Sequence, residues 1–292
     1  MKSAPPLFLK DKTITTELPA FVMSILNCTP DSFWEKSRFS AQTSHDLQKN
    51  TEWALEQFEK GADIIDIGGE STRPGSSYIT EEEELERVIP LVQDIRKHSM
   101  GVISIDTRKS IVMYEAIKAG ADILNDVSAL EDDDNMVSLI ANEKIPVILM
   151  HKRQKPLTMQ QNTVYTDVVK DIAHYLAKRA SFAIENGVDS NKIILDAGIG
   201  FAKNTIDNIT LITACNELEK IIKEDYKLTT YGFLMALSRK TCIGETTGKP
   251  VQDRLAGTLS ANIIAVQNGA KIVRVHDTDE TVDSLKILKE LN

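Results

Sequence analysis

The sequence contains few cysteines, few aromatic residues and no long apolar run. Its three cysteines, Cys28, Cys215 and Cys242, form no Cys-x-x-Cys pair. We therefore expect buried thiols, with neither a disulfide framework nor a structural zinc site. No apolar run approaches the ~18 residues that span a bilayer, and the first residues lack the apolar core and cleavage site of a signal peptide. These absences favour a cytoplasmic protein without a membrane-spanning segment.

Positive charge is also scarce, because the net charge at pH 7 is -9. A protein that binds a nucleic-acid backbone needs a basic face that releases counterions, so we do not expect nucleic acid as a partner. The same net charge repels anionic substrates at long range. A phosphate site would therefore depend on locally placed Arg, Lys and backbone NH groups.

Short apolar runs rich in β-branched residues alternate with longer amphipathic segments along most of the chain. This alternation is typical of right-handed βαβ units in a parallel sheet. Helical segments include Glu81 to Lys97, Asp167 to Asn186 and Pro250 to Asn268. The eight predicted strands run from Phe21 to Asn27, Asp63 to Gly68, Val102 to Asp106, Ile123 to Val127, Pro146 to His151, Ile193 to Gly198, Gly232 to Ser238 and Lys271 to Asp277.

Four helix-to-strand junctions share one pattern, in which a glycine ends the helix just before the next strand. These glycines are Gly61, Gly120, Gly187 and Gly269, and glycine suits the left-handed position after a helix. Eight such units favour an α/β fold closed into a (β/α)8 TIM barrel, with an open eight-stranded sheet as the alternative. We expect one domain over residues 1–292. Residues 1–20 would be an extension whose Leu7 to Leu9 and Thr13 to Thr15 match a short hairpin on the barrel floor.

Polar side chains gather where the predicted strands end, although the interior of a buried parallel strand should be apolar. In a barrel these strand ends surround one mouth, where barrel enzymes carry their reactive residues. The residues predicted there include Asn27, Asp66, Asp106, Asn125, His151, Asp196, Ser238, Lys240, Arg274 and His276.

Asp106, Asn125 and Asp196 each end an apolar run and are predicted to face the mouth. A planar heterocycle with NH and NH2 groups needs such acceptors, and Asn also donates. Leaving those groups unpaired on burial costs ~1 to 3 kcal/mol each, so the site would select its ring. Capping of the next helix is the simpler role for a polar strand end. We expect that role for Thr107, Asp126 and Asp277.

A second set at the strand ends is basic. It comprises Arg73, Lys240, Arg274 and His276. Arg274 and His276 are two residues apart in one strand, so their side chains point the same way. A diphosphate fits this set, because Arg binds phosphate oxygens bidentately and the loops after strands seven and eight form the usual phosphate site of barrels.

Six short motifs occur in order between Phe21 and the C-terminus. They read ILNCTPDSF from residue 25, GESTRPG from 69, IDT from 105, LNDV from 124, SRK from 238 and RVHD from 274. The ordered set resembles the motifs of the dihydropteroate synthases, a pterin-binding barrel family. The resemblance implies condensation of 6-hydroxymethyl-7,8-dihydropterin diphosphate with p-aminobenzoate, with Mg2+ as cofactor, a homodimeric assembly and sensitivity to sulfonamides.

The resemblance also implies roles for individual residues. The pterin ring would be held by Asp106, Asn125, Asp196 and Lys240. The diphosphate would be held by Asn27, Arg274 and His276, with Asn27 also contacting Mg2+. The p-aminobenzoate pocket would be shaped by Phe33, Thr72, Pro74 and Phe201, with Thr241 beside it; Arg73 belongs to the diphosphate set by charge and lies on the loop of this pocket.

The residue inventory shows no obvious pair of nucleophile and base for a covalent intermediate. We therefore expect a dissociative, SN1-like path, in which basic groups stabilise the departing diphosphate. Two other functions fit a pterin-binding barrel: methyl transfer from methyltetrahydrofolate to a corrinoid protein, and pterin binding without catalysis. The diphosphate set argues against the first alternative, and the intact pterin and diphosphate sets argue against the second.

The sequence departs from the family pattern at three places. Ala197 follows Asp196 where proline is usual, and Thr241 stands where serine is usual. The first loop, Phe33 to Phe39, is bulky where the family has a small glycine-containing stretch. Its Trp34 and Phe39 would either join a lid or pack on the barrel rim.

Overall fold

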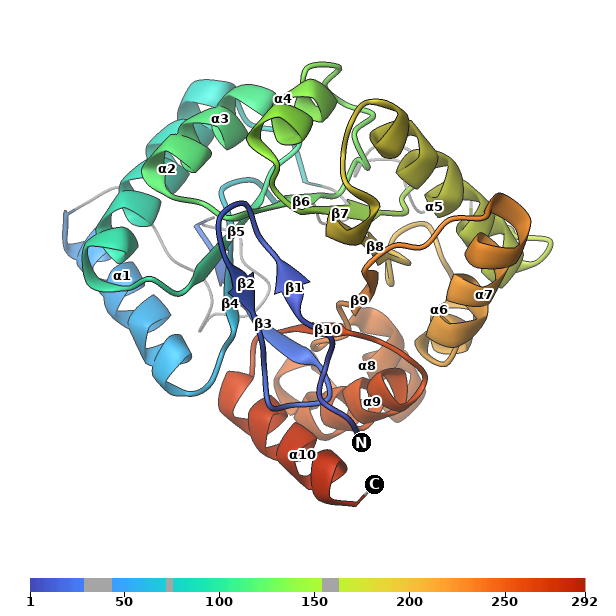
Figure 1. The fold of residues 1–292 in the computed structure, drawn as a ribbon. Coiled ribbons are helices and arrows are strands. Elements are labelled where there is room, and N and C mark those ends of the chain that lie inside the picture. Colours follow the sequence, from blue (N-terminus) through green and yellow to red (C-terminus); the bar gives the residue numbers. More distant parts are fainter. Residues whose placement is uncertain (29–43, 72–75, 154–162, 292) are drawn as a thin grey trace.

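The computed structural model describes residues 1–28, 44–71, 76–153 and 163–291. Eight parallel strands close into a barrel in the order β10, β3, β4, β5, β6, β7, β8 and β9, and helices surround it (Figure 1). The predicted TIM barrel is confirmed, and the open sheet is excluded. The barrel strands are β3 (Phe21–Asn27), β4 (Ile64–Gly68), β5 (Val102–Asp106), β6 (Ile123–Asp126), β7 (Val147–Met150), β8 (Ile193–Asp196), β9 (Gly232–Met235) and β10 (Ile272–Val275).

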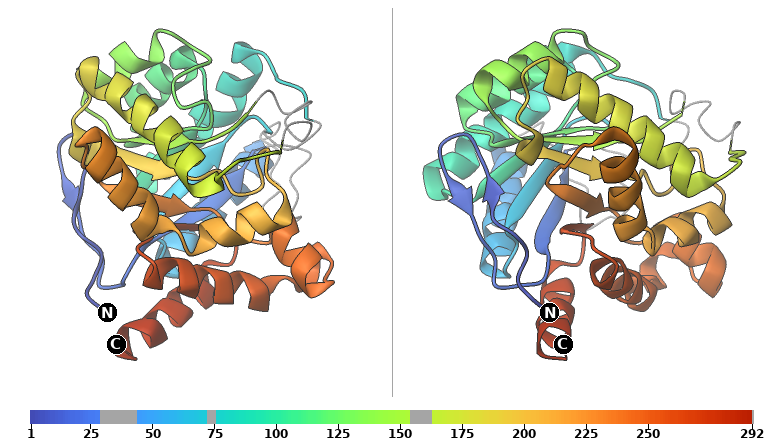
Figure 2. Two further views of the ribbon diagram at one scale, coloured as in Figure 1. Left: turned by 90° about the vertical axis from the view of Figure 1, so that its right-hand side faces the viewer. Right: turned by 45° about the vertical axis from the view of Figure 1, so that its right-hand side comes forward.

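The helices lie outside the strands (Figure 2). They are α1 (Ser44–Glu59), α2 (Glu81–His98), α3 (Ser110–Ala119), α4 (Met136–Glu143), α5 (Val168–Glu185), α6 (Thr205–Ile212), α7 (Cys215–Tyr226), α8 (Thr241–Thr247), α9 (Leu255–Gln267) and α10 (Thr278–Glu290). Helix α2 illustrates why they form: Thr80 caps the NH of Glu83, acidic residues fill the first turn and basic residues the last. The four predicted junction glycines, at 61, 120, 187 and 269, all have positive φ.

The segment before the barrel forms the predicted hairpin. Strands β1 (Leu7–Phe8) and β2 (Thr13–Ile14) pair antiparallel, and Figure 1 shows them across the centre of the ring. Leu7 and Leu9 are buried against the apolar floor of the barrel. The hairpin thus closes the end opposite the strand C-termini.

Cys28, Cys215 and Cys242 are buried free thiols, as predicted. Burial raises the pKa of Cys28 and of Cys215 to about 12, so both stay protonated near neutral pH. Among the described residues, we found no helix with the length and apolar character needed to cross a membrane.

Candidate active site

The barrel interior changes from apolar to polar along four of its strands, β4, β6, β8 and β10. Its floor includes Ile64, Ile123, Ile194 and Ile272, together with Phe21 of the first barrel strand. Side chains two residues apart in a strand point to the same face, so the residues two positions further along also point inward. After the four isoleucines those residues are Asp66, Asn125, Asp196 and Arg274, whereas Met23 follows Phe21. The polar layer at the mouth therefore follows from strand periodicity above an apolar floor.

Arg274 connects two carboxylates in this layer. Its Nε lies 2.6 Å from Oδ2 of Asp66, and its Nη2 lies 3.0 Å from Oδ2 of Asp106. Asn125 Nδ2 donates to the same Asp66 oxygen at 3.0 Å. Asp66 is fully buried, and its Oδ1 has no hydrogen-bond partner within the described parts of the chain. Asp106 and Asn125 thus belong to one network centred on Asp66 and Arg274. The sequence had assigned no role to Asp66.

Lys240 lies across the mouth from this network. Its ammonium donates to the carbonyl oxygen of Ile199 and lies 4.8 Å from the centroid of the Phe201 ring. Asp196 Oδ1 accepts from the backbone NH of Gly198 at 2.7 Å. The loop between β8 and α6 therefore brings together Asp196, Lys240 and Phe201, which had been predicted to bind the pterin or p-aminobenzoate.

Burial perturbs the ionisable groups of the mouth. Burial raises the pKa of Asp106. The positive charge of Arg274 opposes this rise, and the negative charge of Asp66 adds to it. Burial also raises the pKa of Asp196, against the opposing charge of Lys240. The pKa of Lys240 is lowered to about 8 by burial, although Asp196 opposes this shift. Buried charges of both signs gathered at one end of a barrel are characteristic of binding and catalytic sites.

His276 is oriented by Ser238. The Oγ of Ser238 lies 2.9 Å from His276 Nδ1 and also accepts the His276 backbone NH at 3.2 Å. The sequence did not reveal this hydroxyl and imidazole pair. The two bonds hold the ring in place rather than exposing the serine as a nucleophile, because Ser238 is buried.

The expected capping role is wrong for all three residues, because none of their side chains bonds an NH within the following helix. Asp126 accepts from the NH groups of Ser128 and Leu130, and Thr107 accepts from the NH of Lys109, so both stabilise the turn after their own strand. The Asp277 side chain has a different partner. It forms a bidentate ion pair with Arg239, at 2.8 and 2.7 Å.

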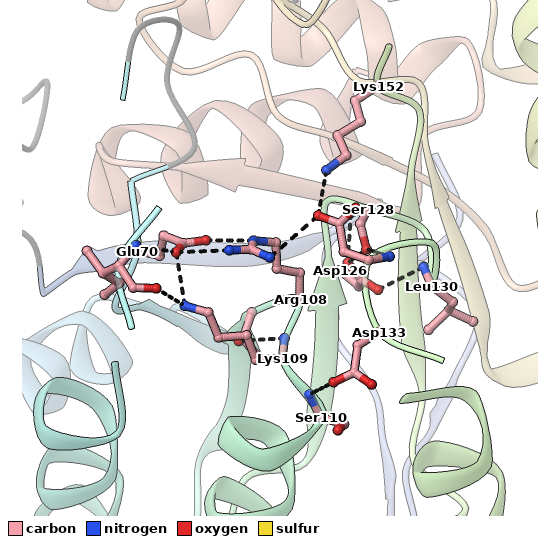
Figure 3. A network of polar contacts seen from close by, with 12 residues as sticks. Glu70, Arg108, Lys109, Ser110, Asp126, Ser128, Leu130, Asp133 and Lys152 are labelled. Atoms are coloured by element: carbon pink, nitrogen blue, oxygen red, sulfur yellow. Dashed lines mark hydrogen bonds and ion pairs between the residues drawn. The ribbon is translucent and has the colours of Figure 1, made fainter. Parts of the chain in front are cut away.

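A network of ion pairs lies beside the mouth at the ends of β4 and β5 (Figure 3). Glu70 accepts from Arg108 Nε at 2.9 Å and from Lys109 Nζ at 3.0 Å. Glu70 also accepts the NH of Ile79 at 2.9 Å, while Lys109 donates to the Ile79 carbonyl at 2.9 Å. Lys109 further pairs with the buried Glu84 at 2.5 Å. These contacts join Glu70 to Ile79 both directly and through Lys109.

Several predicted site residues lie outside the described residues. They are Phe33, Thr72, Arg73 and Pro74, together with Trp34 and Phe39 of the first loop. Thr241 is described, and it is the exposed first residue of α8, directly after Lys240.

Asn27 supplies an oxygen of the kind that a hard cation prefers. Asn27 ends β3, and a Cβ on the neighbouring Gly68 would lie 3.6 Å from Asn27 Oδ1 and 3.9 Å from Asp106 Oδ2. These are ordinary van der Waals distances, and Asp106 Oδ2 already accepts from Arg274, so the amide oxygen of Asn27 is the better candidate ligand. Mg2+ prefers such oxygen ligands, and it usually combines one or two protein oxygens with waters and phosphate oxygens.

Comparison with known proteins agrees with this geometry. The model of a family described as "Pterin binding enzyme" matches residues 23–276. The fold and the polar mouth thus define a barrel enzyme, and the chain belongs to the pterin-binding enzymes.

Within that family the relatives are specific. The chain is 39% identical to a dihydropteroate synthase of Haemophilus influenzae, over 96% of this chain and 97% of the relative. It also matches solved dihydropteroate synthases of Yersinia pestis with a sulfonamide drug (TM-score 0.88, 34% identity, 98% and 99% covered) and of Xanthomonas albilineans with 4-aminobenzoic acid (TM-score 0.85, 35% identity, 99% and 98% covered). The chain belongs to the dihydropteroate synthases.

Proposed function

We propose that this protein condenses 6-hydroxymethyl-7,8-dihydropterin diphosphate with p-aminobenzoate to give 7,8-dihydropteroate and diphosphate, a step of folate biosynthesis. The observation that carries the proposal is the inward polar layer at the barrel mouth. It combines buried acceptors for a heterocycle, Asp106, Asn125 and Asp196, with cations from β10 and from the start of α8.

The pterin ring would lie on the acceptor side of the mouth. Asp106 and Asp196 would accept from its NH and NH2 groups, Asn125 would both donate and accept, and Lys240 would donate to a ring acceptor. Lys240 already donates to a carbonyl oxygen, that of Ile199, so a ligand oxygen could take the same place. Because these groups are buried, a ring that failed to pair with them would be strongly rejected.

Arg274 and His276 would bind the diphosphate. Arg274 lies in β10 and His276 follows one residue after its end, and Arg274 has two ion pairs that anchor it. As the bond between the exocyclic methylene and the diphosphate oxygen breaks, negative charge grows on the leaving group, where fixed donors stabilise it best. The aryl amine then forms the new C–N bond and releases one proton, which completes an SN1-like substitution.

Asn27 would hold Mg2+ through its amide oxygen. When bound, the ion supplies positive charge to the phosphate oxygens of the leaving group. The p-aminobenzoate would lie beside Phe201, next to Thr241, with Phe33, Thr72, Arg73 and Pro74 completing its pocket. Relatives of this chain have been solved with 4-aminobenzoic acid and with a sulfonamide drug, and we expect sulfonamides to compete with p-aminobenzoate here.

Calorimetric titration separates this function from corrinoid methyl transfer. We expect inorganic diphosphate to bind in the presence of Mg2+ and to strengthen the later binding of 6-hydroxymethylpterin. A methyl-transfer site has no leaving diphosphate to hold. Absence of Mg2+-dependent diphosphate binding would therefore exclude the synthase function.

We also propose a homodimer acting in the cytoplasm. Ile206 and Ile209 on α6 and Ile264 on α9 are exposed at 78%, 41% and 41%, and these two helices contact each other. Apolar side chains gathered on neighbouring helices favour a protein partner. The three reduced cysteines suit a reducing compartment. Light scattering should give twice the monomer mass of 32.5 kDa, and Ile206→Glu should lower the measured mass toward that of the monomer.

A further inference from the structure

A lysine that the proposed chemistry does not use is buried behind the mouth. Lys203 precedes α6 and is 4% exposed. Its Nζ lies 2.9 Å from the carbonyl oxygens of Gly198 and Phe201 and 3.0 Å from Nδ1 of His151. An ammonium has three donors, so these three contacts use all of them. Lys203 therefore joins two points of its own loop to the end of β7.

The loop that Lys203 braces has an unusual backbone. Gly198, Gly200 and Ala202 all have positive φ, at 68°, 85° and 53°. A Cβ on Gly198 would lie 1.9 Å from the carbonyl oxygen of His151, so the loop passes directly against the end of β7. Left-handed backbone at a non-glycine residue costs roughly 1 to 2 kcal/mol and persists only where surrounding contacts impose it. The bonds from Lys203 are such contacts.

His151 acts as a fixed acceptor for this lysine. Its ring packs edge-on against Tyr175, with centroids 4.9 Å apart, and lies 6.1 Å from the Tyr165 ring. Burial, with the charges of Lys203 and Arg153, holds the pKa of His151 far below its usual 6.5. The imidazole is therefore neutral, and acceptance at Nδ1 assigns its proton to Nε2.

The same loop contacts Lys240, which is proposed to bind the pterin, and carries Phe201, which is proposed to contact p-aminobenzoate. Its Ile199 carbonyl accepts from Lys240, and its Phe201 ring faces the Lys240 ammonium. The Phe201 carbonyl is bonded directly to Lys203, whereas Lys240 reaches the mouth with its own long side chain. Displacement of the loop would thus move Phe201 more than it would move Lys240.

We propose that Lys203 is a positioning residue, which holds the loop from Ala197 to Asn204 so that Phe201 forms one wall of the p-aminobenzoate pocket. This inference rests on the proposed function. Lys203 acts through Phe201, since all three of its donors are used within the protein. It sets affinity for the aryl amine and has little effect on the pterin.

Lys192 offers a matched control at the other end of the same strand. It precedes β8, and its Nζ also donates to two carbonyl oxygens, those of Leu9 at 3.0 Å and Lys144 at 2.6 Å. Burial lowers the pKa of Lys192, as it lowers that of Lys203, the latter to about 7. A lysine that only supports the fold should behave alike at both ends of β8.

The test compares Lys203→Met, Lys203→Arg and Lys192→Met by steady-state kinetics and urea unfolding. We expect Lys203→Met to raise the KM for p-aminobenzoate at least tenfold and to change the dissociation constant of 6-hydroxymethylpterin less than threefold. Lys203→Arg should restore part of the KM, and Lys192→Met should leave it unchanged. An unchanged KM in Lys203→Met, or equal shifts at both lysines, would overturn the proposal.

A second measurement reads the contact without any substrate. Nitrogen-15 NMR of ligand-free protein should show His151 as the Nε2-protonated tautomer, and its pKa should rise in Lys203→Met because a positive neighbour is lost. The groups facing Lys203 are His151, Asp196, Lys240, Arg153 and Asp207. An unaltered His151 titration refutes the contact, whereas failure of the wild type to form dihydropteroate refutes the function.

If Lys203→Met does not fold, His151→Leu decides the matter. This variant removes one of the three acceptors and leaves the lysine in place. It should raise the KM for p-aminobenzoate about threefold with pterin binding unchanged. Equal effects on both substrates, or none on either, would contradict the positioning role.

Discussion

The Nε of Arg274 lies 2.6 Å from Oδ2 of Asp66, although the strands that carry them, β10 and β4, are separated by β3. Asp66 is fully buried, so this ion pair is shielded from solvent. Arg274 has Asp106 as its second acceptor, and the paired oxygen of Asp66 also accepts from Asn125, whereas the other Asp66 oxygen is unpaired among the described residues. Asp66 therefore fixes the direction in which Arg274 enters the mouth.

Replacing Asp66 should disturb catalysis more than folding. In Asp66→Asn, Arg274 loses a charged partner but keeps Asp106, so we expect kcat/KM to fall by about 10- to 100-fold, the equivalent of one charge-assisted hydrogen bond. Steady-state kinetics and urea unfolding measure the two effects. The control is Asp63→Asn: Asp63 accepts the Val22 NH at 2.8 Å at the opposite end of β4. If Asp63→Asn lowers kcat/KM as much, Asp66 has no specific role in the site.

Removing Arg274 should act on the diphosphate. Arg274→Ala takes away the cation between Asp66 and Asp106, and we expect kcat/KM for the dihydropterin diphosphate to fall by roughly 100- to 1000-fold, as for loss of a fixed donor to a leaving group. Titration with inorganic diphosphate should show the main loss of affinity. The affinity for 6-hydroxymethylpterin, which has no diphosphate, should change less. Equal losses for both ligands would argue against this assignment.

Much of this site could be predicted from the sequence, and the physical reason is strand periodicity. Asp106, Asn125 and Asp196 end apolar runs, and the structure places all three at the mouth. Asp66 received no role because it lies inside its run, followed by Ile67 and Gly68. The sequence feature that could have identified Asp66 is its place two residues after Ile64, which points into the barrel.

Other contacts depend on tertiary structure that no local pattern encodes. Asp277 has the position of a helix cap, but Arg239 from the loop after β9 pairs with it. Ser238 and His276 meet because neighbouring strands end side by side. Lys203 was missed because its partners depend on the left-handed backbone of its own loop.

Lys240 should set the alkaline limit of activity. Its pKa is lowered to about 8, mainly by burial, so the donor form is lost as pH rises through that value. We expect kcat/KM for the dihydropterin diphosphate to decline above pH 8, approaching tenfold per pH unit. In Lys240→Arg the side chain stays charged, so the decline should disappear even if the maximum is lower. A wild-type profile that stays flat to pH 10 would contradict this role.

His151 should make the fold sensitive to acid. Its pKa is depressed in the folded state, so between the unfolded value of 6.5 and that lower value the unfolded chain binds more protons. Stability from this group is therefore complete above pH 6.5 and declines as pH falls, by at most about 1.4 kcal/mol per pH unit. Urea unfolding between pH 7 and pH 5 should show that the free energy of unfolding declines less in His151→Asn than in the wild type, because Asn keeps an acceptor but cannot ionise. Parallel declines would mean that His151 is not held neutral.

The most direct test of the whole account is an assay of 7,8-dihydropteroate formation by the purified protein. The protein should form product from 6-hydroxymethyl-7,8-dihydropterin diphosphate and p-aminobenzoate with Mg2+ and release one diphosphate per product. It should form no product from the dihydropterin alcohol that lacks the diphosphate. Absence of dihydropteroate from a folded protein that binds both substrates, or equal turnover of the alcohol, would contradict it.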